Sequence, residues 1–297
     1  MARQGPGHVR PRGTRPHRGG QRPAPGQGAR AQPRRRRLSL SDAQLERYAR
    51  HIVLKEIGGA GQRRLLGARV AVVGAGGLGA ALLPQLAAAG VGRIRLIDHD
   101  RVSLSNLQRQ TLYTTADIGR LKVEAAAERL AALNPDCAIE PLALRLDAGN
   151  AAGLLEGAEV AADGTDSFAA RLAVADAAHA LRVPLVSAAI GPFEGQLATF
   201  RGWEPGLPCY RCLVGAATDR PGRSCAEVGV LGALAAAMGA LQALEVIREL
   251  VGFGEGLAGR LLIHDALSQR SRVISLPKDP ACPGCGPGAA QPAGPTG

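Results

Sequence analysis

Two pairs of cysteines have the spacing of a metal site. Cys209 and Cys212 form one Cys-x-x-Cys pair, and Cys282 and Cys285 form another near the end of the chain. Two such pairs commonly build a closed tetrahedral site in which four thiolates hold Zn²⁺ and leave no position for water. We therefore predict a structural zinc that ties the C-terminal segment to the residues around Cys209. A redox dithiol and disulfides are the alternatives.

A glycine-rich loop lies between a short apolar run and a helical run. Its sequence is GAGGLG, with glycines at Gly74, Gly76, Gly77 and Gly79. Glycines let the backbone approach phosphates, and the helix that follows offers free N–H groups and a positive dipole end. Asp98 ends the next apolar run, where an acidic side chain can bind a ribose hydroxyl. The pattern predicts a bound nucleotide without choosing one, because dehydrogenases use the same loop.

Basic residues follow the second apolar run. Arg109 lies in a polar connection over residues 99–118, and Lys122 follows it. Both suit an ATP triphosphate, where negative charge builds up during transfer, whereas a nicotinamide enzyme needs no such pair. The alternative is a solvated loop and a lysine at a helix N-terminus. Asp166 follows a later strand and either holds Mg²⁺ against the phosphates or caps a helix.

The order of predicted elements indicates an α/β fold. Apolar runs at 69–74, 93–98, 138–144, 158–163 and 184–189 alternate with helical runs at 78–89, 119–133 and 168–181. This alternation predicts a doubly wound, mostly parallel, Rossmann-like sheet. Ser39 or Ser41 is expected to cap a first helix that runs to residue 57. After Gly195 we expect shorter strands at 196–200, 260–263 and 271–276 around a long helix over 228–251, in a zinc-bearing C-terminal part.

Charge is distributed unevenly along the chain. Its net charge is +11, and residues 1–37 hold eleven arginines and no acidic residue, which leaves 25 basic against 25 acidic residues afterwards. We predict a disordered Arg-rich tail (1–37), a folded domain (38–286) and a second disordered tail (287–297). Nucleic-acid binding beyond weak contact with the tail is not expected. The most apolar stretch, 228–241, is too short for a membrane span, and no leader is recognisable, so we expect a cytoplasmic protein.

The combined motifs resemble the MoeB/ThiF/HesA adenylyltransferases, bacterial relatives of the ubiquitin-activating enzymes. The resemblance covers residues 45–286 and rests on Arg47-Tyr48-x-Arg50, GAGGLG, Asp98-x-Asp100, SNLQRQ at 105–110 and Gly119-x-x-Lys122. It implies that the C-terminal carboxylate of a ubiquitin-like sulfur-carrier protein ending in Gly-Gly attacks ATP, which gives an acyl-adenylate and pyrophosphate. The motifs are somewhat closer to the molybdopterin branch than to the thiamine-thiazole branch.

The resemblance also implies site residues. Gly77, Asp98 and Asp100 would hold the nucleotide, Arg109 and Lys122 would neutralise phosphates, and Arg50 would reach a partner's site across a homodimer interface. The implied nucleotide contacts also include Ser105, Asn106, Leu107, Gln108, Asp166 and Ser167. The family pattern at 164–167 is Cys-Thr-Asp-Asn, whereas this chain has Gly-Thr-Asp-Ser, so only the threonine and aspartate are kept.

Cys225 stands apart from the paired cysteines, just before the predicted long helix. A thiol near a helix N-terminus has a lowered pKa and is a better nucleophile. We expect it to take an acyl group or to help in sulfur transfer. Cys137, in a predicted strand, is expected to be a small core residue. Because the chain ends too soon for an appended rhodanese domain, a separate sulfur donor is expected.

Three other interpretations remain open from the sequence. A nucleotide-dependent oxidoreductase would use GAGGLG and Asp98 but would leave Lys122 and the cysteine pairs without a role. A tRNA-modifying dehydratase relative would also adenylate a carboxylate, but it lacks the two cysteine pairs. A non-enzymatic module would use the basic tail to hold nucleic acid.

Overall fold

The computed structural model describes residues 40–216 and 229–287. The predicted tail 1–37, Cys225, Ser39 and the expected start of the long helix at residue 228 lie outside the described residues. Among the described residues, no helix is long and apolar enough to cross a membrane.

One mixed sheet organises the described residues, with strand order β3-β2-β1-β4-β5-β6-β7-β8. The strands from β1 to β5 are parallel, and β6, β7 and β8 are added antiparallel to one another and to β5. The predicted doubly wound, mostly parallel sheet is thereby confirmed. The strand bounds are β1 (Arg69–Val73), β2 (Arg93–Ile97), β3 (Ala138–Leu142), β4 (Val160–Asp163), β5 (Leu185–Ile190), β6 (Glu194–Phe200), β7 (Arg260–Asp265) and β8 (Arg270–Ser275).

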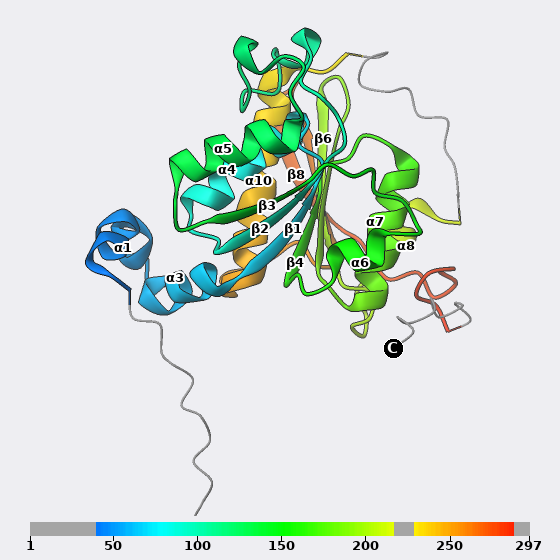
Figure 1. Ribbon diagram of the computed structural model, residues 1–297. Coiled ribbons are helices and arrows are strands. Elements are labelled where there is room, and N and C mark those ends of the chain that lie inside the picture. Colours follow the sequence, from blue (N-terminus) through cyan, green and yellow to red (C-terminus); the bar gives the residue numbers. More distant parts are fainter. Residues whose placement is uncertain (1–39, 217–228, 288–297) are drawn as a thin grey trace, which may run out of the picture. The chain divides into compact units, whose positions relative to one another are not determined.

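Helices cover both faces of the sheet (Figure 1). One layer consists of α4 (Gly77–Ala88), α5 (Lys122–Leu133) and α10 (Gly232–Val251), and the other of α6 (Ala151–Leu155), α7 (Phe168–Leu181) and α8 (Tyr210–Val214). Two hydrophobic clusters, one on each face, fill the space between the layers and the sheet. The strands β1 and β4 are buried on both sides, which explains why their sequences are continuous apolar runs and not alternating ones.

The N-terminal helical region differs from its prediction. Ser41 caps α1 (Asp42–Arg47) through a capping box with Gln44, but the helix breaks at Tyr48 before α2 (Ala49–Ile52). The Tyr48 ring is buried, and its hydroxyl donates to Asp136 and accepts from Asn134, so the chain turns to insert this side chain. The single helix predicted to residue 57 was wrong, since that tertiary contact overrides the local helical pattern.

Helix α3 (Gly58–Gly67) was not predicted, because its sequence begins GGAG and glycine is a poor helix former. The structure gives one of these glycines a packing reason. A Cβ added at Gly61 would lie 2.9 Å from Val251 at the end of α10, so glycine lets the two helices approach closely. The short helix α6 was also missed.

The connecting segment (residues 98–121) joins β2 to α5. It contains two short 3₁₀ helices, η1 (Leu104–Asn106) and η2 (Thr115–Asp117), each begun by a capping box. Asp117 is 6% exposed and accepts hydrogen bonds from the backbone N–H and hydroxyl of Thr114, both at 2.8 Å, and from Arg120 at 3.1 Å. These bonds hold a segment that has little regular structure.

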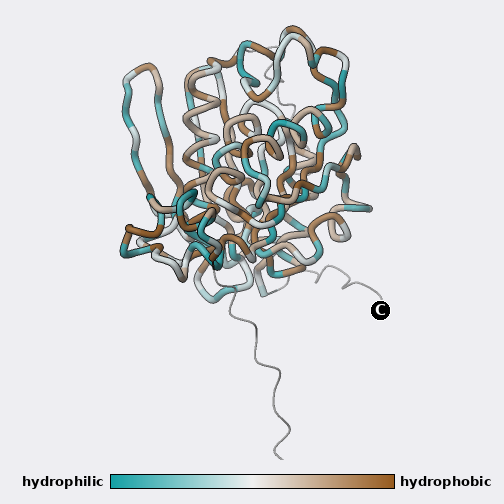
Figure 2. Tube along the Cα trace, turned by 60° about the vertical axis from the view of Figure 1, so that its left-hand side comes forward, coloured by the Kyte–Doolittle hydropathy of each residue, from teal (hydrophilic) through white to brown (hydrophobic). Residues whose placement is uncertain are grey.

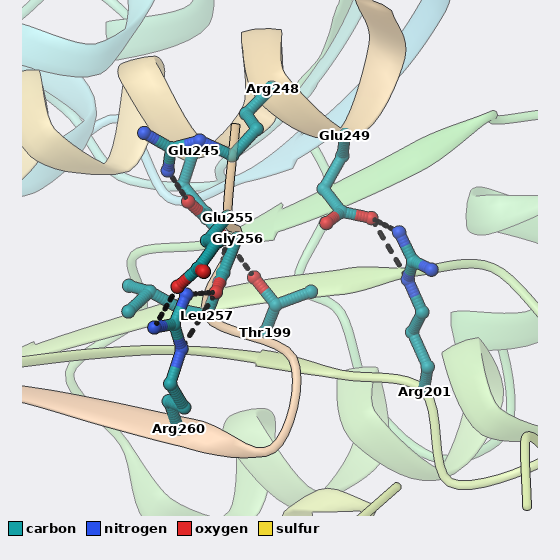
Figure 3. Close-up of polar contacts among 9 residues, drawn as sticks. All are labelled: Thr199, Arg201, Glu245, Arg248, Glu249, Glu255, Gly256, Leu257 and Arg260. Carbon is teal, nitrogen blue, oxygen red and sulfur yellow. Dashed lines mark hydrogen bonds and ion pairs between the residues drawn. The ribbon is translucent and has the colours of Figure 1, made fainter. Parts of the chain in front are cut away.

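Helix α10 is bonded to the sheet through its polar side chains. The sequence of α10 is largely apolar, and its charged residues, Glu245, Arg248 and Glu249, all lie in its C-terminal half (Figure 2 colours the trace by hydropathy). Glu245 is 1% exposed and accepts hydrogen bonds from the Thr199 hydroxyl at 2.9 Å and from the backbone N–H of Leu257 at 2.5 Å (Figure 3). Arg248 pairs with the same carboxylate, and Arg201 pairs with Glu249 one turn along.

Candidate functional site

The glycine loop (residues 74–79) lies at the carboxyl end of β1 and opens α4. Gly74 has φ +98°, and its added Cβ would be 3.0 Å from the carbonyl oxygen of Gly164. A Cβ at Gly79 would be 2.2 Å from the carbonyl oxygen of Gly74. Only glycine therefore fits these two positions. At Gly76 the nearest atom to an added Cβ is the Gln110 amide nitrogen, 3.8 Å away, which is an ordinary van der Waals contact, so the described residues do not crowd this position.

Asp98, predicted for a ribose, bonds to the protein's own backbone. One carboxylate oxygen accepts from the N–H of Ala75 at 2.7 Å, and the other accepts from the N–H of Asp100 at 2.8 Å. The Tyr113 hydroxyl donates to the carbonyl of Ala75 at 2.9 Å. Asp98 and Tyr113 together fix the first turn of the glycine loop. The role of Tyr113 could not be predicted, because its partner lies 38 residues away along the chain.

Lys122 and Asp100 form an ion pair beside this loop. The ammonium of Lys122, whose side chain is 5% exposed, lies 2.8 Å from the carboxylate of Asp100. The Asp100 carbonyl also accepts from the Lys122 N–H at 3.0 Å. Partial burial opposes ionisation of Asp100, but the hydrogen bond and charge of Lys122 hold its pKa below the ordinary value. The predicted phosphate lysine is therefore neutralised by an acid that was itself predicted to contact the nucleotide.

Arg109 is a cation whose side-chain stem contacts the glycine loop. Its guanidinium donates to the Ser105 carbonyl at 3.0 Å, and its side-chain carbons lie 3.6 Å from a Cβ added at Gly77. Among the described residues it forms no ion pair. A guanidinium with unused donors at a glycine loop suits a phosphate oxygen.

The four predicted site residues before Arg109 (Ser105, Asn106, Leu107 and Gln108) have different roles in the structure. The Asn106 side chain accepts from the Ser103 N–H and belongs to the capping box of η1. Leu107 packs against the core, and among the described residues the Ser105 hydroxyl hydrogen-bonds to the Ser103 hydroxyl alone. The Gln108 carbonyl lies 2.3 Å from a Cβ added at Gly232, which brings the start of α10 against this segment. Of these four predicted residues, Asn106 and Leu107 therefore shape the connecting segment itself.

Asp166 lies beside the glycine loop, at the carboxyl end of β4. The helix cap is Ser167, whose hydroxyl accepts from the Ala170 N–H at 3.1 Å, so the alternative reading of Asp166 as a cap was wrong. Asp166 is exposed and has no hydrogen bond among the described residues. Asp163, which was not predicted as a site residue, is buried and accepts hydrogen bonds from the hydroxyls of Thr165 and Ser187, both at 2.8 Å. These bonds hold the turn that presents Asp166.

Gln110 is a second residue that the sequence analysis did not single out. It is 3% exposed, and its Oε1 is buried with no hydrogen-bond partner among the described residues. Its amide nitrogen is the atom nearest to a Cβ added at Gly76. In the sequence this buried amide beside the glycine loop is only the last residue of SNLQRQ and could not be recognised.

Arg50 lies far from the glycine loop of its own chain. Tyr48, two residues earlier, packs against Gly90 at the C-terminal end of α4, whereas the loop is at the N-terminal end of that helix. The 12 residues of α4 span about 18 Å. Arg50 is exposed and has no hydrogen bond or ion pair among the described residues. Within one chain, the structure does not bring Arg50 to the other predicted site residues.

The four paired cysteines form one cluster. The Sγ distances are 3.9 Å for Cys209–Cys212, 3.5 Å for Cys209–Cys282 and 3.5 Å for Cys212–Cys285, and all four sulfurs lie within 4.8 Å of one another. Four thiolates around a tetrahedral metal with Zn–S bonds of about 2.3 Å would be separated by similar distances, so the donor set fits Zn²⁺. The N–H groups of Asp279 and Gly284 point at these sulfurs, as expected for thiolates. Cys137 is separate and buried, as predicted.

The sheet and its glycine loop define a Rossmann-like α/β protein. Residues 48–284 match the model of the ThiF family, so the chain belongs to this family. The sulfur carrier protein adenylyltransferase of Thermus thermophilus is 46% identical over 250 residues, which cover 82% of this chain and 91% of that protein. The molybdopterin-synthase adenylyltransferase of Escherichia coli is 41% identical over 247 residues, which cover 83% of this chain and 98% of that protein.

Among solved structures, that of Escherichia coli MccB superposes with a TM-score of 0.72 at 21% identity and covers 83% of this chain and 74% of that chain. At this identity the likeness concerns the fold alone.

Proposed function

We propose that this protein uses ATP to adenylate the C-terminal carboxylate of a ubiquitin-like sulfur-carrier protein ending in Gly-Gly. The observation that carries the proposal is the side chain of Arg109, whose carbons lie against Gly77 of the glycine loop and whose guanidinium has no ion-pair partner among the described residues. Two relatives that are 46% and 41% identical over most of both chains are named as adenylyltransferases of such systems. A nicotinamide enzyme would have no use for this arginine, which disfavours an oxidoreductase.

In the proposed reaction, a carboxylate oxygen of the carrier attacks the α-phosphorus of ATP. The new bond joins the acyl oxygen to phosphorus, and the bond to the pyrophosphate oxygen breaks, with its electron pair leaving on pyrophosphate. Carboxylates are ionised at neutral pH, so the step needs no proton transfer. The protein must therefore position two anions and stabilise charge on the phosphoryl oxygens.

The residues of this chain fit these tasks. The backbone N–H groups at the start of α4 would hold phosphate oxygens, with Gly76 leaving room for them. Arg109 would donate to the phosphates, and Lys122, paired with Asp100, would add a second positive charge. Asp98, whose oxygens hold the loop, would take a ribose hydroxyl on its remaining lone pairs. The residues Ser105, Asn106, Leu107, Gln108 and Ser167 would line the nucleotide.

Two metals fit the side chains present. Asp166 is an exposed carboxylate beside the glycine loop, and carboxylate oxygens are ligands that Mg²⁺ prefers, so it would hold Mg²⁺. When bound, Mg²⁺ would neutralise phosphate charge. The four clustered cysteines would hold a structural Zn²⁺ that joins α8 to residues 279–286.

Cys225, which lies outside the described residues, and Arg50, which is described, also have proposed roles. Cys225 would take the acyl group as a thioester, or would help sulfur transfer from a separate donor protein. Arg50 would act on the site of a partner copy in a homodimer. We also propose a cytoplasmic protein whose folded domain spans 38–286, between two disordered tails. The carrier would be that of molybdopterin synthesis, with the thiamine-thiazole carrier as the alternative.

The test is ATP–pyrophosphate exchange with purified protein and each of the two Gly-Gly carriers. Exchange with one carrier and not the other would support adenylation and choose the pathway. Arg109→Ala should lower the exchange rate by about 100-fold or more, as for loss of a donor to transition-state charge. Protein that binds ATP but exchanges with neither carrier would overturn the proposal.

The matched control is Arg101→Ala. Arg101 lies in the same connecting segment and, like Arg109, donates to a backbone carbonyl, here that of Gly119 at 2.8 Å. Its loss should leave exchange near the wild-type rate. Equal loss in both variants would mean that the segment had been distorted and that Arg109 has no specific role.

A further inference from the structure

Four exposed arginines lie at the amino edge of the parallel sheet, where its strands begin. Arg69 and Arg93 open β1 and β2, Arg64 is in the last turn of α3, and Arg182 follows α7 as its C-cap. Among the described residues, none of these four guanidinium groups has an ion pair. The glycine loop is at the other end of β1, about 17 Å away, so this surface is separate from the candidate nucleotide site.

Arg69 and Arg93 lie directly opposite each other in the sheet. The parallel register of β1 and β2 pairs their Cα atoms, so both side chains leave the same face at neighbouring positions. Like charges at opposite positions repel one another. Arg95, two residues further along β2, is paired with Glu140 at 3.3 Å, whereas the first two arginines have no such acid. An anion bound at this edge would relieve the repulsion between them.

The acidic residues in the loops of this edge are fewer, and two of the three already have partners. Asp136, before β3, accepts from the Tyr48 hydroxyl at 3.1 Å. Glu159, before β4, accepts from the backbone N–H of Arg69 at 3.2 Å. Glu156 is exposed and is the third. The edge therefore carries an excess of positive charge that its own acids do not neutralise.

A hollow of about 460 Å³ opens at the same edge, with Arg64 and Arg182 in its walls. The hollow also has acidic residues, namely Glu159, Glu204 and Glu249. Glu249, whose side chain is 4% exposed, pairs with Arg201 (Figure 3), and Glu204 lies 3.4 Å from the same guanidinium. Because these acids are taken up by Arg201 and by a backbone N–H, the two unpaired cations of the hollow are free to bind an anion.

Trp203 also lines the hollow. It is half-buried and is the only tryptophan of the chain. Its ring lies 6.2 Å from that of His179 at an angle of 42°, so the two rings are not stacked face to face. An aromatic ring beside unpaired guanidinium groups is the combination that proteins use to hold the bases and the phosphates of a single strand.

We propose that this amino edge binds single-stranded nucleic acid, with a base against Trp203 and backbone phosphates on Arg64, Arg69, Arg93 and Arg182. Guanidinium groups stay charged and bind phosphate through two parallel hydrogen bonds. The hollow has the volume of an ordinary small-ligand site, which suits one nucleotide. An acidic peptide would use the arginines but has no planar group for the indole ring. Contacts with phosphates and with the face of a base do not read sequence, so binding should be sequence-tolerant.

Nucleic-acid binding by the folded domain was not expected from the sequence, because the residues after Arg37 include 25 basic and 25 acidic ones. The structure shows that these charges are unevenly distributed. Acids and bases neutralise each other in pairs such as Lys122–Asp100 and Arg201–Glu249, whereas the arginines of the amino edge are left over. A balanced total charge therefore does not exclude a local site for a polyanion.

The fluorescence of Trp203 tests the site in the full chain, because no other tryptophan contributes to it. Titration with single strands of about eight nucleotides, oligo(U) and oligo(dT), should quench the emission saturably. Stronger quenching by one of them would identify RNA or DNA as the ligand. A labelled strand that binds by anisotropy without changing the emission would place nucleic acid elsewhere on the chain and would overturn the proposal. Equal quenching by polyglutamate would also overturn it. Neither ATP nor a carrier is present, so the result is independent of the proposed adenylation.

Two double variants test the arginines. Arg64→Ala combined with Arg182→Ala should weaken binding by about 10-fold or more, and should reduce the slope of log affinity against log salt by about 1.4, since two phosphate contacts are lost. The matched control is Arg270→Ala combined with Arg272→Ala, which removes the same charge from two exposed arginines of β8 that have no ion pair among the described residues. The control should keep the wild-type affinity and slope. Equal weakening in both double variants, with native circular dichroism, would mean that only total charge matters and would overturn the site.

Discussion

The ammonium of Lys122 lies 2.8 Å from the carboxylate of Asp100, in the first turn of α5. A cation at a helix N-terminus opposes the helix dipole, and the aspartate offsets that unfavourable term. The pair is asymmetric, because the lysine side chain is 5% exposed and the aspartate side chain 52%. Removal of the lysine would leave an uncompensated acid beside the proposed phosphates.

This asymmetry predicts unequal effects of two variants. Lys122→Ala should lower ATP–pyrophosphate exchange by about 100-fold or more, since it removes a positive charge and exposes a negative one. Lys122→Ala combined with Asp100→Ala should recover about 10-fold of that loss, because residues in contact are not additive. A wild-type exchange rate in the single variant would show that Lys122 does not act on the phosphates. Equal rates in the single and double variants would show that the Asp100 charge does not affect the reaction.

Two substitutions in the glycine loop, Gly76→Ala and Gly79→Ala, should distinguish effects on stability from effects on nucleotide binding. Gly76→Ala has room for its methyl group, so the free energy of unfolding should change by no more than about 1 kcal/mol, whereas the methyl group should raise the Kd for ATP by about 10-fold or more. Gly79→Ala meets the Gly74 carbonyl and should lose both stability and binding. Thermal unfolding and calorimetric titration with ATP measure the two quantities.

The control for this series is Gly153→Ala in α6, where nothing lies within 4 Å of the added Cβ. It should leave both quantities unchanged. Unaltered ATP binding by Gly76→Ala would mean that phosphates do not approach the loop at this position.

The sequence was sufficient for the parts of the fold in which local pattern and tertiary position agree. The apolar run of β1 followed by GAGGLG predicted a strand, a tight loop and a helix, and the structure has all three. The four cysteines were equally readable, because their spacing reflects metal chemistry. Tyr48 broke a predicted helix because its partners, Asn134 and Asp136, lie more than 80 residues away.

The sequence predicted which residues lie together at the candidate site, but it did not predict the hydrogen bonds that they make. The sequence placed Asp98, Asp100 and Lys122 near one another, and the structure agrees. It could not reveal that Asp98 uses both oxygens on backbone N–H groups, since such bonds depend on how the loop closes. Asp163 stabilises the turn before Asp166, and Tyr113 stabilises the first turn of the glycine loop. Neither residue belongs to a recognisable sequence motif.

Acid should weaken the connecting segment through Asp117. Hydrogen bonds from the backbone and side chain of Thr114, with help from Arg120, hold the pKa of this carboxyl below its ordinary value. A depressed pKa stabilises the folded state above the unfolded pKa of about 3.9, and that contribution is lost as pH falls through the folded value. Asp117→Asn should therefore be less stable than wild type at pH 7, and the difference should shrink below about pH 4.

Urea unfolding at pH 7 and near pH 3 measures this difference in free energy. Asp265→Asn is a suitable control, since Asp265 also has a lowered pKa but lies at the exposed turn between β7 and β8, away from the connecting segment. A gap between wild type and Asp117→Asn that grows on acidification would contradict the assignment.

Arg50 should act in trans. Arg50→Ala and Lys122→Ala are each expected to be inactive as homodimers, but a mixed dimer has one site with its own Lys122 and the partner copy's arginine. Co-refolded in equal amounts, the two variants should recover about one quarter of wild-type exchange, because half of the dimers are mixed and each has one intact site. No recovery, with mixed dimers shown by mass spectrometry of tagged chains, would mean that Arg50 serves its own chain or none.

The cysteine cluster should hold about one zinc per chain, as a single four-thiolate site requires. The sulfurs are 3.5 Å or more apart in the contacts that join the two pairs, well beyond the ~2.05 Å of a disulfide, so metal is the better explanation of their convergence.

Cys212→Ser should lose the metal and lower the melting temperature, whereas Cys137→Ser, a buried thiol outside the cluster, should keep the metal. The Arg211–Asp176 ion pair also joins α8 to α7, so the sheet should stay folded in Cys212→Ser. Hydrogen exchange should detect local loosening around residues 279–286. Well-folded wild-type protein without zinc would exclude the site.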